Sequence, residues 1–275
     1  MRVVIVRARS FSPFFRRGLG LLLLAGLLLG LLLGSLFGYF AHRPGKSEIT
    51  DTYRYDKRTA INGIELHTIQ TTPESIRLQA IAANVTATPY YGINGGFFWK
   101  GSLLSIAVVN DRPLKGEPGD YGSGWYNTGV DGHLRRGTLV WDEIAKTFSV
   151  QVAWRADDLV ATDKRHYWAQ GGVSMSLGNE AMREPIMIAE QMPAYDEARM
   201  RSGLVYDRDN RLYLIVTPTR CTVEQFRSAI LTELGDRHLV DGVFLDGDGS
   251  SQLRTKRASL AGDHRQVYQM LSIVQ

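Results

Sequence analysis

The chain has 275 residues, 44% of them hydrophobic and 22% charged, which suits one sizeable globular domain. The formal net charge is +4, but the basic residues are scattered among acidic ones, so a nucleic-acid-binding surface is not expected. Cys221 is the only cysteine, which excludes an intrachain disulfide and predicts a packing role for its side chain.

Residues 18–41 predict a single-pass membrane anchor, because they carry no charged side chain and are rich in leucine. Their length suffices to cross a bilayer core of about 30 Å. Arginines in residues 1–17 predict a basic cytoplasmic tail, so the main domain is expected on the periplasmic side of the inner membrane. A cleaved signal peptide is the alternative, although its apolar core normally covers only about 7–15 residues. Residues 42–59 form a predicted linker to a main domain at 60–275.

The predicted membrane segment also carries a regular series of glycines. They recur at every fourth position and would form one smooth ridge on a helix, where a second copy of the chain can approach closely. This predicts a homodimer, although glycine is frequent throughout this segment and the spacing has an equally simple explanation. The four positions are Gly26, Gly30, Gly34 and Gly38.

Apolar patterning predicts strands and two helices in the main domain. Thr222 and Gln225 match a capping box at the start of a helix, and Gly235 suits its end. A second helix is predicted at 75–85, although Leu78 interrupts its apolar period. Strands are predicted at 62–70, 103–110, 138–141, 147–154, 212–217, 243–245 and 267–274.

The order of these elements predicts an α+β or mixed α/β fold. Strand 212–217, helix 222–235 and strand 243–245 follow one another as in an α/β unit. The expected architecture is a central twisted mixed sheet flanked by helices and preceded by one transmembrane helix. Residues 116–132, rich in glycine, tyrosine, aspartate and asparagine, are expected to form a lid or a binding rim.

Two turns concentrate polar groups in a way that predicts a site. Residues 245–251 read LDGDGSS and follow a short apolar strand, so two carboxylates, two glycines and two hydroxyls share one turn. Glycine allows positive φ and leaves amide groups free to face a ligand. Residues 92–98 read GINGGFF, a turn followed by aromatic residues. A surface turn with local hydrogen bonds, or a turn leading into core aromatics, is the simpler alternative for each.

These two turns resemble the LDGGGSS and NGGFF motifs of the phosphodiester glycosidase family. Asp248 stands where that family usually has glycine. Two further segments are similar to family blocks, namely the aromatic-to-glycine turn with Gln170 and the stretch from Arg201 to Gly203. The resemblance extends over most of residues 60–275.

The resemblance implies a hydrolase that cleaves a sugar-1-phosphodiester in an extracytoplasmic glycan or glycolipid. Asp246 is the expected catalytic carboxylate and Arg201 the expected phosphate clamp, with Arg199 as its competitor, because a guanidinium group binds two oxygens at once. Asp248 is expected either to share a proton with Asp246 or to bind a divalent cation, calcium or magnesium, with it. The expected catalytic residues are Asp246, Asp248 and Arg201, and the expected substrate-binding residues are Asn94, Gly95, Gly96, Phe97, Gln170, Gly249, Ser250 and Ser251.

The sequence also allows functions other than this hydrolase. The domain would also suit a non-catalytic module that binds envelope polysaccharide, using the loop at 116–132. A peptidase or esterase built on Ser250 or Ser251 is disfavoured because no obvious base histidine accompanies them, and the absence of Gly-x-Ser-x-Gly argues against an ordinary serine hydrolase. His166 is a candidate acid or base, although a lone histidine is more often a surface or packing residue. Zinc motifs, a C-x-x-C pair and a P-loop are also absent.

Overall fold

The computed structural model describes residues 48–129 and 132–274. The compact unit of the chain extends over residues 45–275. Within the described residues, none of the helices has both the length and the apolar character needed to cross a bilayer. The predicted anchor at 18–41 and its glycine ridge lie outside the described residues.

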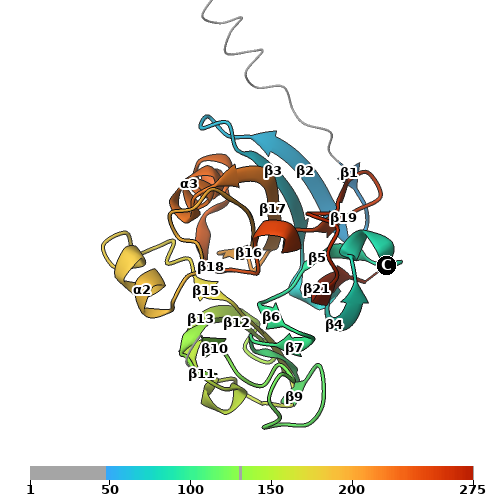
Figure 1. Cartoon of the computed structure of the whole chain (residues 1–275), viewed down its shortest axis with the longest axis vertical. Coiled ribbons are helices and arrows are strands. Elements are labelled where there is room, and N and C mark those ends of the chain that lie inside the picture. Colours follow the sequence, from blue (N-terminus) through green and yellow to red (C-terminus); the bar gives the residue numbers. More distant parts are fainter. Residues whose placement is uncertain (1–47, 130–131, 275) are drawn as a thin grey trace, which may run out of the picture. The chain divides into compact units, whose positions relative to one another are not determined.

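Three antiparallel sheets make up most of the unit (Figure 1). The largest, in strand order, contains β1 (Glu48–Ile49), β2 (Tyr53–Thr59), β3 (Glu65–Thr71), β17 (Leu212–Cys221), β16 (Arg199–Asp207), β18 (Leu239–Phe244) and β15 (Val173–Ser174). The second contains β13 (Thr147–Ala153), β12 (Arg136–Asp142), β14 (Tyr167–Gly171), β8 (Ala107–Val109) and β9 (Arg112–Pro113). The third contains β20 (Ser259–Leu260), β19 (Leu253–Arg254), β5 (Tyr91–Asn94), β21 (Val267–Ile273) and β4 (Ile76–Ala83).

Short elements connect these sheets. Two hairpins stand apart from them, β6 (Phe98–Trp99) with β7 (Ser102–Leu103) and β10 (Thr128–Gly129) with β11 (Gly132–His133). The described α-helices are α2 (Arg183–Ala189) and α3 (Val223–Leu234). The 3-10 turns are η1 (Pro73–Ser75), η2 (Val85–Ala87), η3 (Ala156–Asp158), η4 (Gly235–Arg237) and η5 (Asp248–Ser250).

The predicted mixed sheet flanked by helices is wrong. Every pairing between the named strands is antiparallel, and the two described α-helices have only 7 and 12 residues. Strand β17, helix α3 and strand β18 do follow one another as predicted, and Thr222 and Gln225 form the predicted capping box. However, β16 lies between β17 and β18 and pairs antiparallel with both. The two strands that the helix connects run in the same direction without touching, so no parallel pair forms.

The predicted helix at 75–85 is also wrong, because residues 76–83 form strand β4. Ile76 and Leu78 are buried while Arg77 between them is exposed, which is the alternation of a strand. Leu78, which interrupts the helical period, therefore fits the strand period. Residues 53–59, placed in the linker by the sequence, form β2 and add Tyr53 and Tyr55 to the core.

The largest sheet is buried on both faces, which explains its apolar central strands. Leu212, Leu214 and Val216 of β17 face a core shared by all three sheets. Tyr213 and Ile215 of the same strand face a second core under α3. Cys221 is buried in this second core, and burial raises the pKa of its thiol to about 11, as a packing role requires.

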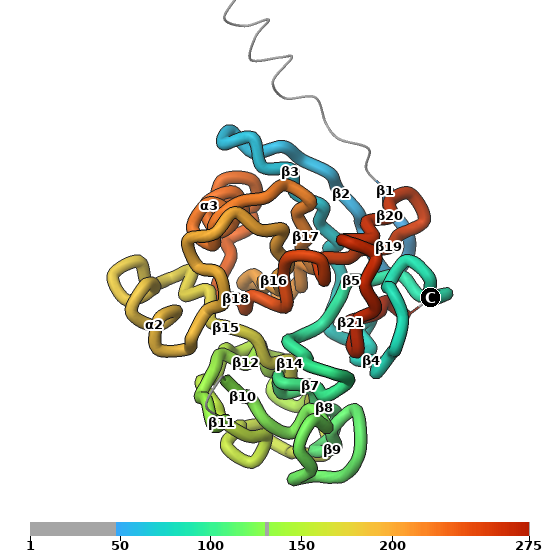
Figure 2. Tube along the Cα trace, in the orientation of Figure 1, coloured from blue at the N-terminus to red at the C-terminus, as the bar shows by residue number. Residues whose placement is uncertain are grey.

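The arrangement brings together segments that are distant in sequence. Figure 2 shows the chain around β5, β16, β18 and the turn of η5 near the middle of the unit, with the second sheet, drawn in green and yellow, below them. The turn at 245–252 follows β18 of the largest sheet and leads into β19 of the third. The two motifs found in the sequence therefore meet where these two sheets join.

Candidate functional site

Asn94, at the end of β5, joins the two motif turns. Its side-chain amide donates to the carbonyl of Asp246 at 2.8 Å. Its side-chain oxygen accepts from the Ser202 hydroxyl at 2.9 Å and from the Gln252 amide at 3.1 Å. The side chain is only 1% exposed. Asn94 therefore holds the backbone of Asp246 in place from β5, and its contact with a substrate remains a prediction.

The glycines that follow Asn94 are packed from behind by buried side chains. The Gly95 amide donates to the Gln269 carbonyl at 2.9 Å, and the Gly96 amide donates to the Gln269 side chain at 3.1 Å. A Cβ on Gly96 would lie 2.5 Å from the Cβ of Ser105, so only glycine fits there. The Gln269 amide in turn donates to Gln170, which is fully buried. Gln170 thus supports this turn from beneath.

Asp246 is the central carboxyl of the site. It lies just after β18, and its carboxylate accepts from the Gly247 amide at 3.0 Å. Burial raises the pKa of Asp246 to about 6, and the charge of Asp248 adds to this rise. The Gly247 amide and the positive charge of Arg265 act in the opposite direction. The Asp246 carboxyl therefore exchanges a proton near neutral pH, as general acid–base catalysis requires.

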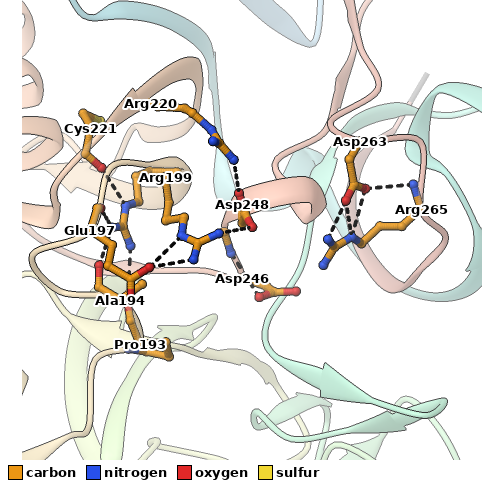
Figure 3. Close-up of polar contacts among 12 residues, drawn as sticks. Pro193, Ala194, Glu197, Arg199, Arg220, Cys221, Asp246, Asp248, Asp263 and Arg265 are labelled. Carbon is orange, nitrogen blue, oxygen red and sulfur yellow. Dashed lines mark hydrogen bonds and ion pairs between the residues drawn. The ribbon is translucent and has the colours of Figure 1, made fainter.

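Asp248 begins η5 with a φ of 51°, a conformation that suits glycine and that aspartate tolerates better than most residues. This explains why a glycine is usual at the equivalent position of the motif. The carboxylate of Asp248 turns toward two arginines, with Arg199 at 3.0 Å and Arg220 at 3.4 Å (Figure 3). Asp248 therefore neutralises cations beside the site.

The guanidinium group of Arg201 is occupied by backbone carbonyls. It donates to Cys221 at 3.2 Å, to Pro193 at 3.3 Å, to Ala194 at 2.5 Å and to Glu197 at 2.7 Å. The side chain is 3% exposed, and burial lowers its pKa. Arg201 therefore shapes the loop at 193–197, and most of its donors are already in use.

The second turn places its glycine and serines inside the protein. A Cβ on Gly249 would lie 2.1 Å from the Asp263 carboxylate, so a larger residue would displace that side chain. Ser250 and Ser251 are 0% and 2% exposed, and neither hydroxyl has a partner with hydrogen-bond geometry in the described part of the chain. Asp263 binds Arg265 through both carboxylate oxygens, with the guanidinium Nε at 2.9 and 3.0 Å.

A cavity of about 220 Å³ opens over the Asp246 turn. In Figure 3 the Asp246 carboxylate lies between the Arg199 cluster and the Asp263–Arg265 pair. The cavity thus combines one carboxyl of raised pKa with several cations and an aromatic wall. Its lining residues are Phe97, Met192, Pro193, Ala194, Arg199, Arg201, Leu245, Asp246, Gly247, Asp248 and Arg265.

The aromatic wall is supported by a buried pair that sequence reasoning missed. The guanidinium of Arg136 lies 4.8 Å from the centre of the Phe97 ring and donates to the carbonyls of Glu190 and Gln191 at 2.8 and 3.0 Å. Burial raises the pKa of the Glu190 carboxyl, which Ser174 holds through its amide and its hydroxyl. No local motif marks these residues, because the contacts join distant parts of the chain.

Arg265 was also missed, although it lines the cavity together with Asp246. The available signal was the charged stretch Asp263-His264-Arg265 between the second motif and the last strand. His166 does not line the cavity, and its side chain is 52% exposed beside Glu143 at 3.9 Å.

The residues do not form an evident metal site. Both carboxylate oxygens of Asp248 are held by arginines. Across residues 48–129 and 132–274, no three His, Cys, Asp or Glu side chains gather closely enough to hold a metal ion. We therefore derive no step through the divalent cation expected at Asp246 and Asp248.

The fold resembles that of a known glycosidase domain. The zebrafish N-acetylglucosamine-1-phosphodiester alpha-N-acetylglucosaminidase catalytic domain, auto-inhibited by its pro-peptide, superposes with a TM-score of 0.55 at 15% identity, over 86% of this chain and 85% of that one. A hypothetical protein from Synechocystis gives a TM-score of 0.47 at 14% identity, over 85% of this chain and 64% of that one. No protein-family model and no curated protein matches the sequence. The chain therefore shares its fold with a glycosidase catalytic domain.

Proposed function

We propose that this chain is a hydrolase that cleaves the bond between a sugar's anomeric carbon and the oxygen of a phosphodiester. The observation that carries the proposal is the cavity in which Asp246, with a pKa raised to about 6, lies among arginines. Perturbed carboxyls in clefts are typical of catalytic sites. The resemblance of both turns to phosphodiester glycosidase motifs, and the shared fold, support the same chemistry.

Arg199 and Arg265 are the cations that we assign to the phosphate. Both line the cavity, and each is partly exposed, with 36% and 46% of its side chain accessible. Their present partners, Asp248 and Asp263, also hold them in position. A guanidinium group can bind phosphate oxygens while it keeps a carboxylate contact on another edge. Arg201, the clamp expected from the sequence, contributes charge and builds the loop at 193–197.

Asp246 would act as the base in this reaction. Its ionised form takes a proton from water, the water oxygen bonds to the anomeric carbon, and the bond from that carbon to the phosphate oxygen breaks. The phosphate monoester leaves with the bonding electron pair, and its stable negative charge makes strong protonation of the leaving group unnecessary. Because the ionised form of Asp246 is required, kcat/KM is expected to rise with pH through about 6.

The location of the domain is a further part of the proposal. The uncharged, leucine-rich residues 18–41 would attach the chain to the inner membrane, with the domain on the extracytoplasmic side. The substrate would then be a glycan or glycolipid of the cell envelope. Pairing of two chains through the glycines at 26, 30, 34 and 38 would place two sites side by side at that surface.

The proposal is tested with the full chain in detergent and a panel of sugar-1-phosphodiesters, measuring release of free sugar. Asp246→Asn keeps the size of the side chain and is expected to lower turnover at least about 100-fold, the usual scale for an acid–base group. Asp236→Asn, at a side chain that is 72% exposed, is the matched control and should retain full activity. Parallel assays with a chelator test for a metal requirement, and we expect no effect.

Turnover that survives in Asp246→Asn would refute the assignment of the base. Absence of turnover across the whole panel, with retained binding of envelope polysaccharide, would favour a non-catalytic binding module instead. An esterase built on Ser250 or Ser251 receives no support, because both hydroxyls are buried.

A further inference from the structure

Exposed and half-buried aromatic side chains gather at the hairpin of β6 and β7. Trp99 is 64% exposed. Tyr121, in the loop that packs against this hairpin, is 68% exposed, and its neighbour Gly122 accepts a hydrogen bond of 2.9 Å from β7. Tyr268 of β21 lies under the hairpin turn, where a Cβ on Gly101 would be 3.5 Å from its ring. Three aromatic side chains therefore surround one two-stranded hairpin.

Two lysines stand among these rings. The ammonium of Lys100 lies 5.6 Å from the centre of the Trp99 ring, and that of Lys115 lies 5.9 Å from the centre of the Tyr268 ring. Lys115 also donates to the carbonyl of Gly101 at 2.5 Å. Neither ammonium group forms an ion pair with a carboxylate in the part of the chain that the structure describes, whereas three other lysines there do. Their charge is therefore available to an anionic ligand.

The turn of the hairpin is built with an unfavourable residue. Lys100 and Gly101 have φ values of 47° and 86°, and positive φ at both central residues defines a type I′ turn. Asparagine followed by glycine is the preferred sequence there, and a lysine at positive φ is strained. Such strain is typical of positions where the side chain has a role other than folding.

The hairpin is continuous with the cavity. Phe97, which lines the cavity, precedes Trp99 by two residues, and Arg265, which also lines it, precedes Tyr268 by three. A chain extends at most about 3.6 Å per residue, so these backbone positions lie within roughly 7 and 11 Å of the cavity wall. These aromatic and basic residues are therefore close enough to contact a ligand that extends beyond the cavity.

We propose that this surface, which we call the hairpin platform (Trp99, Lys100, Lys115, Tyr121 and Tyr268), binds further units of an anionic glycan that enters the cavity. Pyranose rings present apolar C–H faces that pack on aromatic rings, and phosphates pair with ammonium groups. A surface on which each ammonium group lies close to a ring therefore suits a chain of alternating sugars and phosphates. The inference rests on the proposed function and narrows its substrate to a sugar-phosphate polymer instead of a single diester.

The test compares two substrates with the full chain in detergent. One is a polymer of N-acetylhexosamine-1-phosphate repeats, and the other is the methyl diester of the same sugar phosphate. Trp99→Ala is expected to raise KM for the polymer about tenfold and to leave kcat and KM for the methyl diester unchanged. Ile61→Ala is the control, because Ile61 is 95% exposed and does not belong to the platform.

Lys100→Asn separates binding from folding. Asparagine suits the type I′ turn better than lysine, so the melting temperature is expected to stay equal or to rise while affinity for the polymer falls several-fold. The remaining affinity is expected to depend less on salt, because one cation has been removed. Weaker binding that accompanies a lower melting temperature would point to damage of the hairpin and would overturn the role of this lysine.

Direct binding distinguishes failure of the platform from failure of the proposed function. Affinity electrophoresis in gels that contain the same polymer measures binding without turnover, with neutral dextran as the control polymer. Retarded migration that is lost in Trp99→Ala supports the platform even if neither substrate is hydrolysed. Unchanged retardation in Trp99→Ala, or an equal rise of KM for both substrates, overturns it.

Discussion

The raised pKa of Asp246 predicts that the ionised carboxylate destabilises the folded domain. Burial is the main cause of the rise, so folding favours the protonated form. The contribution of the protonated Asp246 carboxyl to the free energy of unfolding is therefore fully present below its unfolded pKa of 3.8. It is lost as the pH rises through the folded pKa of about 6. Asp246→Asn places a neutral group of the same size there. The side-chain oxygen of the asparagine can still accept the hydrogen bond that the Gly247 amide donates to Asp246 at 3.0 Å in the wild type.

The size of the effect follows from the two pKa values. The difference between 3.8 and about 6 is roughly two units, and each unit corresponds to about 1.4 kcal/mol. Asp246→Asn is thus expected to be about 3 kcal/mol more stable than the wild type at pH 7 and about equal to it below pH 4. For a domain of this size, that gain raises the melting temperature by roughly 6–12 °C. The same substitution is expected to lower turnover at least about 100-fold, so stability and activity change in opposite directions.

Urea unfolding at a series of pH values between about 4 and 7.5 measures this difference, with Asp236→Asn as the exposed control. The control is expected to match the wild type throughout. A variant at Asp246 that is less stable than the wild type at pH 7 would refute the argument. So would a stability difference that does not change with pH, because it would arise from packing instead of ionisation.

Arg201→Gln is expected to lower the free energy of unfolding in urea by roughly 3 kcal/mol, because several buried carbonyls lose their donor. Arg199→Gln is expected to raise KM with little change in stability. Equal unfolding midpoints for the two variants would contradict this difference. Asn94→Ala is expected to lower the free energy of unfolding by about 3 kcal/mol in the same assay, since it removes the hydrogen bonds between β5 and the Asp246 turn. An unchanged free energy of unfolding would show that these hydrogen bonds are dispensable. Asp248→Asn is expected to lower the midpoint of the pH–rate profile, because the Asp248 charge raises the pKa of Asp246, and a shift to higher pH would refute that coupling.

The supporting contacts show how the site is built from several parts of the chain. Asn94 fixes the Asp246 turn from β5, and Arg201 shapes the loop at 193–197 from β16. Arg136 packs on Phe97 and binds the carbonyl of Glu190. Each of these side chains is buried and forms most of its hydrogen bonds with the backbone. Precise placement of the partly exposed groups in the cavity depends on this buried layer.

Local patterns in the sequence predicted several elements correctly. The capping box at Thr222 and the apolar face of the following helix are local signals, since residues three and four apart meet on a helix. Alternation in 212–217 likewise predicted a strand, and β17 has buried residues on both faces. Motif spacing also located the two turns that meet at Asp246, because each turn has its own backbone requirements.

The sequence alone determined where the helix α3, strand β17 and the two polar turns lie, because these depend on contacts between near neighbours in the chain. Only the tertiary structure decided the antiparallel pairing, since β16, the strand directly before β17 in the chain, lies between β17 and β18 and pairs with both. It likewise decided which of the arginines that line the cavity is bound to backbone carbonyls. Arg201 and Arg265 have the same side chain, but carbonyls from a neighbouring loop occupy the first, while the second lies at the cavity beside Asp246. These contacts depend on how the loop at 193–197 folds back onto β16 and on how Arg265 approaches the Asp246 turn, and no sequence motif records either arrangement.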